Sequence, residues 1–136
     1  MQNTPPPLYL VSACLVGLCT RYDGKIKPNA TCLEILRYAT WIPVCPEQLG
    51  GLPTPREAAD IIGGSGEDVL AGRARVITKS GLDVSESFIK GASQVLSVAC
   101  SQPVDSVILK ANSPSCGCNG VTASLLRQHG FRLREF

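Results

Sequence analysis

The sequence predicts a single α/β domain of three layers (α/β/α), in which helices cover both faces of a mostly parallel sheet. Apolar runs typical of strands alternate along the chain with segments whose apolar residues recur every three to four positions, as in parallel sheets with helical crossovers. The length of 136 residues suits one compact domain and is too short for two ordinary ones. We therefore expect residues 8–136 to form one domain behind a disordered lead of residues 1–7.

The first half of the chain predicts two strands, one helix and two loops. Leu8 to Val11 is an apolar run suited to a buried strand, and Gly17 to Asn29 is a loop with glycine and proline. A helix is predicted from Ala30 to Ala39, and Trp41 to Val44 is the second strand. Gly50 to Gly72 is rich in glycine and proline, which predicts one long irregular segment that covers a site.

The second half predicts two strands, two helices and an extended C-terminal segment. Ala74 to Thr78 suits a short edge strand, and Val84 to Ser101 has the apolar spacing of a helix. Val104 to Lys110 is the third clear strand, Val121 to His129 is helical in pattern, and Phe131 to Phe136 is extended. Ligands of such sheets bind beyond the carboxyl ends of the strands, so we expect the functional site there.

Charge and composition argue against several classes of partner. Thirteen Lys and Arg against 11 Asp and Glu leave a net charge of +2 that is scattered along the chain, so no nucleic-acid or membrane footprint is expected. Residues 1–7 lack the pattern of a signal peptide, and no run of about 18 uncharged apolar residues occurs, so we expect a cytoplasmic protein without a membrane helix. The seven cysteines then favour metal or redox chemistry over a disulfide framework. The oligomeric state is left open.

Three of the cysteines lie in turn-rich segments that follow predicted strands. Cys14 and Cys45 come directly after apolar runs, and Cys116 follows the third strand within a few residues, among serines, a proline and a glycine. If the three strands are neighbours, the three thiols meet at one edge of the sheet. Thiolates gathered in this way bind soft metals or iron–sulfur clusters, and three protein ligands on a four-site centre leave one site open for substrate.

The other four cysteines have alternative interpretations. Cys32 and Cys100 lie on predicted helices and are most simply core or half-buried thiols. Cys19 and Cys118, together with Cys14 and Cys116, offer four sulfurs to a structural zinc ion, which would make the chain a small binding module without catalysis. A thiol redox protein is disfavoured because no Cys-x-x-Cys motif is present.

Four segments resemble the family known as domain of unknown function 523. They are Val11 to Gly17, Thr20 to Gly24, Pro43 to Arg56 and Leu109 to Gly117. In the members of that family characterised as thiouracil desulfidases, three cysteines hold a 4Fe-4S cluster and the fourth iron takes sulfur from a thiolated pyrimidine. The resemblance implies that Cys14, Cys45 and Cys116 are the cluster ligands here. It also implies that the partner is a small thiolated heterocycle, converted to its oxo form and hydrogen sulfide without net redox change.

That chemistry requires groups that move protons beside the open iron. Glu47, two residues after Cys45, is the expected general base or acid, and Ser113 is expected to position the water or the ring. Asp23 is a third candidate, for contact with the pyrimidine edge or for buffering protons, although Asp-Gly is also a common turn pair. Arg21 and Arg56 either orient the ring or pair with acids.

The chain departs from the family pattern after Cys118. Only Cys118 and Asn119 stand between the Ser-Pro-Ser-Cys-Gly motif and Gly120, where members carry a longer glycine-rich stretch. A true deletion predicts a more open pocket and altered substrate selectivity.

Overall fold

The computed structural model describes residues 4–136, so residues 1–3 of the predicted lead lie outside the described residues. Residues 4–7 form neither helix nor strand. Within residues 4–136, no helix combines the length and apolar character needed to cross a bilayer.

The main sheet has four parallel strands. In chain order they are β1 (Leu8–Ser12), β2 (Thr40–Val44), β5 (Ser106–Leu109) and β6 (Leu133–Glu135), and their order in the sheet is β2-β1-β5-β6. All three neighbouring pairs run parallel, so the carboxyl ends of β1, β2 and β5 lie at the same edge. The three clear strands expected from the sequence are therefore neighbours, and the predicted mostly parallel α/β fold is confirmed.

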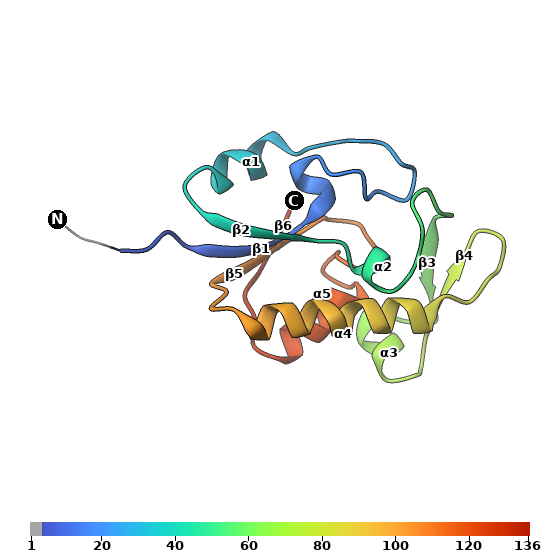
Figure 1. Ribbon diagram of the computed structural model, residues 1–136. Helices are drawn as coiled ribbons and strands as arrows, with labels where there is room; N and C mark the ends of the chain where they lie inside the picture. Colours follow the sequence, from blue (N-terminus) through green and yellow to red (C-terminus); the bar gives the residue numbers. More distant parts are fainter. Residues whose placement is uncertain (1–3) are drawn as a thin grey trace.

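Helices cover both faces of this sheet (Figure 1). On one face, Leu10, Val107 and Leu109 pack against α4 (Ser85–Ser101) and α5 (Val121–Gln128). On the other face, Val11 and Ile108 pack against α1 (Ala30–Leu36) and the short 3-10 helix η1 (Ala13–Val16). Successive strand residues thus point to opposite cores, as the period of two in a strand requires.

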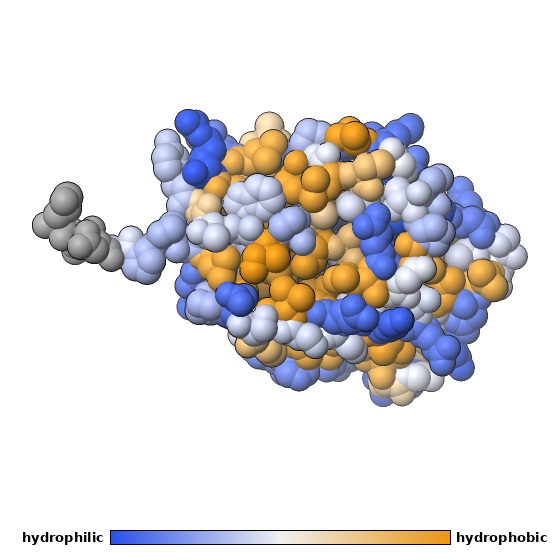
Figure 2. Space-filling view, in the orientation of Figure 1, coloured by the Kyte–Doolittle hydropathy of each residue, from blue (hydrophilic) through white to orange (hydrophobic). Residues whose placement is uncertain are grey.

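The surface view locates the apolar side chains of the first face. Figure 2 shows them gathered in the middle of the visible face, over β2 and α4, with hydrophilic residues around them. Ile42 of β2 and Leu96 of α4 are partly buried and pack against the cluster that contains Leu10. This apolar area is therefore continuous with the core.

The segment from Gly50 to Gly72 is not one irregular loop, which corrects the prediction from its glycines and prolines. It contains β3 (Ala59–Ile62) and α3 (Gly66–Leu70). β3 pairs antiparallel with β4 (Arg75–Thr78) in a separate two-stranded sheet, so the strand predicted at Ala74 to Thr78 is not an edge of the main sheet. The helix α3 begins with a capping box between Ser65 and Asp68.

Smaller differences concern the ends of the elements. The first helix ends at Leu36 rather than Ala39, and a four-residue helix α2 (Pro46–Leu49), which the sequence did not predict, follows Cys45. Pro46 occupies the first turn of α2, where a proline costs no hydrogen bond.

Close packing of α2 against α4 fixes the position of the segment that carries Glu47. A Cβ on Gly91 of α4 would overlap the carbonyl oxygen of Pro46, and a Cβ on Gly50 would overlap the carbonyl oxygen of Ser87. Because both obstacles are backbone atoms, the two helices approach as closely as they do only with glycine at these positions.

We expect Gly91→Ala to lower the free energy of unfolding by about 2 kcal/mol or more, since overpacking forces the backbone to move. The midpoint of thermal unfolding measures this effect. Ser93→Ala, on the exposed side of the same helix, is the matched control and should stay within about 0.5 kcal/mol of wild type. Equal stability of Gly91→Ala and the control would contradict the described helix contact.

Candidate active site

Three cysteines from three strand ends line one pocket. Cys14 lies in η1 directly after β1, Cys45 is the N-cap residue of α2 directly after β2, and Cys116 lies in the turn region between β5 and α5. All three line a pocket of about 380 Å³ at the carboxyl edge of the sheet. The sequence-based expectation that these thiols meet at one edge agrees with this geometry.

Burial governs the protonation of two of these thiols. Burial raises the pKa of Cys116 to about 12, although the Ser12 and Ser115 hydroxyls oppose the shift. Burial also raises the pKa of Cys14, aided by the nearby Cys45 and opposed by Lys110 and Arg21. Without a bound metal centre, Cys14 and Cys116 are therefore neutral thiols at pH 7 and poor nucleophiles. A bound metal centre would convert such thiols to thiolates.

The pocket suits a group larger than one ion. No three Cys, His, Asp or Glu side chains in residues 4–136 are close enough together to hold a single metal ion. The three sulfurs instead stand around a pocket of about 380 Å³. Sulfur donors from three separate segments fit an iron–sulfur cluster with one iron free of cysteine.

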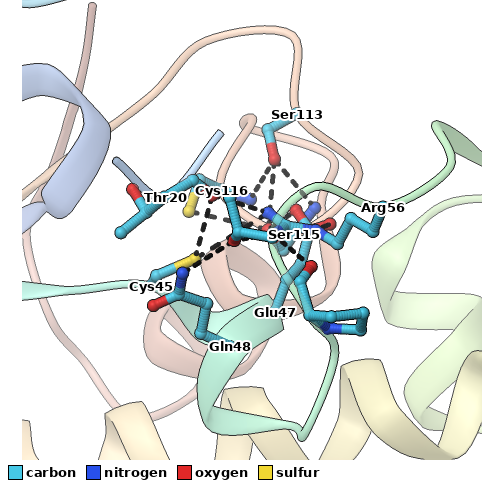
Figure 3. Close-up of polar contacts among 10 residues, drawn as sticks. Thr20, Cys45, Glu47, Gln48, Arg56, Ser113, Ser115 and Cys116 are labelled. Atoms are coloured by element: carbon cyan, nitrogen blue, oxygen red, sulfur yellow. Dashed lines mark hydrogen bonds and ion pairs between the residues drawn. The ribbon is translucent and has the colours of Figure 1, made fainter. Parts of the chain in front are cut away.

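A chain of hydrogen bonds joins Glu47 to Ser113 beside the sulfurs (Figure 3). The Ser115 hydroxyl donates to Glu47 Oε2 at 3.1 Å, and the Ser113 and Ser115 hydroxyl oxygens are 3.1 Å apart. Ser113 Oγ also accepts the backbone N–H groups of Ser115 and Cys116, at 3.2 and 3.1 Å. Glu47 and Ser113, both predicted from the sequence, therefore lie in one hydrogen-bond network and are connected through Ser115.

The chemistry of the groups sets the direction of this chain. An ionised carboxylate only accepts hydrogen bonds, so the single Ser115 proton points to Glu47. Ser115 Oγ then accepts the Ser113 proton, and the two backbone N–H groups face any negative charge that develops on Ser113 Oγ. Ser115 is only 1% exposed and was not among the predicted site residues. Its place in the Ser-Pro-Ser-Cys motif, one residue before a candidate ligand, is the signal that could have identified it.

Arg56 pairs with Glu47 on the side away from Ser115. Arg56 Nε lies 2.9 Å from Glu47 Oε1, and the two side chains are only 7% and 15% exposed. Of the two roles open to Arg56 from the sequence, pairing with an acid is the one the structure shows.

Asp23 lies outside the pocket lining. Its carboxylate forms an ion pair with Arg21 at 3.0 Å and accepts the backbone N–H of Lys25. The Arg21 guanidinium, together with the Lys25 N–H group, lowers the pKa of Asp23 to about 2. Its neighbours Arg21 and Tyr22 line the pocket instead. The geometry therefore gives Asp23 the role of holding the turn that presents these two residues.

The remaining cysteines stand apart from the pocket that Cys14, Cys45 and Cys116 line. Cys32 is fully buried in the α1 core, as expected, whereas Cys100 is exposed on α4 rather than half-buried. Cys19 is exposed and its Sγ lies 3.4 Å from the Gly24 carbonyl oxygen. Cys118 is exposed and lines two neighbouring hollows. The four sulfurs of the zinc interpretation therefore do not line one pocket.

The shortened stretch after Cys118 forms a tight connection to α5. The Cys118 backbone N–H donates to Glu135 of β6, and its carbonyl oxygen accepts from Arg127 at 2.7 Å. A hollow of about 460 Å³ opens beside this turn and shares Asp60, Asn112, Ser113 and Pro114 with the cysteine pocket. The region around the site is accordingly open on this side.

Comparisons with known proteins agree on one family. A family model described as 2-thiouracil desulfurase matches residues 9–135. The uncharacterized protein YbbK of Bacillus subtilis (strain 168) is 43% identical over 141 residues, which cover 93% of each chain. A solved structure described as the 4Fe-4S-dependent thiouracil desulfidase TudS matches with a TM-score of 0.81 at 35% identity, over 95% of this chain and 90% of that one.

Proposed function

The chain belongs to the 2-thiouracil desulfurase family, and on that premise we propose that it removes sulfur from a thiolated pyrimidine of the thiouracil type. Water replaces the sulfur, so the products are the oxo compound and hydrogen sulfide, and no electrons are exchanged. The observation that carries the proposal is the single pocket in which three cysteine thiols, Glu47 and its serine partners stand together. A cytoplasmic location, where thiols stay reduced, suits this chemistry.

Cys14, Cys45 and Cys116 would hold a 4Fe-4S cluster, as the description of the similar desulfidase suggests. The fit rests on their sulfur donors and on the pocket between them. When bound by three cysteines, the cluster supplies one iron that is free to accept the sulfur of the substrate. Arg21 and Lys110 line the same pocket and place positive charge near the sulfur that becomes anionic.

Glu47, Ser115 and Ser113 would move the protons of the reaction. As water adds to the thiocarbonyl carbon, Ser113 takes a proton from it and passes its own proton to Ser115, which passes one to Glu47 Oε2. The two N–H groups on Ser113 Oγ stabilise the charge that this transfer develops there. The proton on Glu47 returns along the same path to the departing sulfur. The second proton of the water leaves the new hydroxyl as the C=O bond forms and goes to the same sulfur, so hydrogen sulfide departs and the residues end as they began.

Ser115→Ala tests the path, because it removes the middle hydroxyl and keeps all three proposed ligands, with only a 3.7 Å contact to Cys116 Sγ lost. We expect kcat to fall by roughly 10²-fold, the lower end of what a positioned proton-transfer group contributes, while the iron content stays at the wild-type level. Ser97→Ala, an exposed serine on α4, is the matched control. Unchanged turnover in Ser115→Ala would show that Glu47 and Ser113 act without Ser115.

The proposed activity is tested by anaerobic incubation of the purified protein with 2-thiouracil and no reductant. Formation of uracil and hydrogen sulfide in equal amounts is the expected result. A colourless protein that holds one zinc ion and forms no uracil would instead identify a zinc-stabilised binding module.

A further inference from the structure

Arg56 joins the candidate catalytic carboxylate to two other parts of the pocket (Figure 3). Its Nε donates to Glu47 Oε1 at 2.9 Å, and its Nη2 donates to the Thr20 carbonyl oxygen at 2.8 Å. The same Nη2 lies 3.9 Å from Cys45 Sγ. Its backbone N–H donates to the Tyr22 carbonyl oxygen at 2.8 Å. One residue therefore contacts the proposed base, a proposed ligand and the loop that presents Arg21 and Tyr22.

The two oxygens of Glu47 have different partners. Oε1 faces Arg56, and Oε2 faces Ser115. With Oε1 held by the guanidinium, Oε2 is the oxygen that remains for proton transfer. We propose that Arg56 is the positioning residue of the site, which fixes Glu47 so that Oε2 meets Ser115 and fixes the Thr20 to Tyr22 segment against Cys45.

Only arginine offers enough donors for this role. The guanidinium has five N–H groups, and Nη1 donates to the Pro53 carbonyl oxygen and to Thr54 Oγ1 at 3.1 and 2.9 Å. With Glu47, Thr20 and Cys45 as the other partners, every N–H group has an acceptor. A lysine keeps the charge but has three donors on one nitrogen atom, so it cannot reach partners on three sides.

The inference rests on the proposed function for its kinetic test, and a second test is independent of activity. In Arg56→Lys we expect wild-type iron content and KM but a kcat lower by roughly 10²-fold, because a misplaced catalytic group costs rate rather than ground-state binding. In Arg56→Ala, added guanidinium ion, well below denaturing concentrations, should restore part of the lost kcat. Arg73→Ala removes an exposed arginine that pairs with Asp68 outside the pocket lining, and it should match wild type with no response to guanidinium.

The second test uses hydrogen exchange of the metal-free protein. Backbone amides of residues 20–24 and 45–48 should exchange faster in Arg56→Ala than in wild type and in Arg73→Ala. If the wild type forms no uracil from 2-thiouracil, the proposed function fails, and the exchange rates alone decide on Arg56. A wild-type kcat in Arg56→Lys, lost turnover that guanidinium does not restore in Arg56→Ala, or exchange rates that match wild type in both segments would overturn the proposal.

Discussion

Replacement of Cys14, Cys45 or Cys116 by Ser is expected to abolish iron retention and desulfuration together. Serine is a harder and less easily ionised ligand than cysteine, and each of these residues supplies one of only three proposed anchors. Loss of one anchor should therefore release the cluster rather than shift its properties. Iron and sulfide analysis of the anaerobically purified variants measures retention, and uracil formation from 2-thiouracil measures activity.

Other cysteines of the same chain provide the controls. Cys100→Ser and Cys19→Ser change exposed thiols, and Cys32→Ser changes a buried thiol in the α1 core. All three should keep the iron content of the wild type, and Cys32→Ser alone should lower stability, because it leaves a hydroxyl in an apolar core. Full iron content in Cys45→Ser would remove Cys45 from the ligand set.

Glu47→Gln is expected to keep the cluster and lose turnover by more than roughly 10²-fold. Arg56 Nε requires an acceptor at 2.9 Å, so the amide oxygen of the replacement faces Arg56 and its NH₂ group faces Ser115. That NH₂ group donates where the carboxylate accepted, which reverses the hydrogen bond to Ser115. The path is then blocked although the shape of the side chain is preserved.

Gln48, the neighbour of Glu47, bonds Thr54 rather than Ser115, so Gln48→Ala serves as the control. Turnover in Gln48→Ala should stay close to wild type. Normal kcat in Glu47→Gln with full iron content would show that Glu47 is not the proton acceptor of the reaction.

The main sheet was predictable because its strands are short apolar runs placed between helical patterns. Leu10 and Val11 face different cores, so the β1 run is apolar throughout, as expected for a strand of a parallel sheet. The antiparallel pairing of β3 with β4 was missed, because Gly63 and Gly64 follow β3 and the prolines precede it. Glycine and proline mark turns, but they do not say whether a strand lies between them.

The residues of the site could be predicted from the sequence, whereas the hydrogen bonds and ion pairs between them could not. The cysteines could be placed because parallel strands end at one edge, which is a property of topology. The link from Glu47 through Ser115 to Ser113 depends on the turn after β5 and on the packing of α2 against α4. Arg56 lies nine residues after Glu47 in the sequence. No local sequence pattern distinguishes such a buried pair from a surface ion pair.

The dependence of desulfuration on cluster content in the wild-type protein most directly tests whether the reaction takes place at an iron–sulfur cluster. Samples with graded iron and sulfide content, prepared anaerobically from the metal-free protein, are assayed for uracil formation from 2-thiouracil without reductant. A rate that rises in proportion to cluster content, from zero in the metal-free protein, is the predicted result. Uracil formation by the metal-free protein, or none by the fully loaded protein, would contradict desulfuration at a cluster held by Cys14, Cys45 and Cys116.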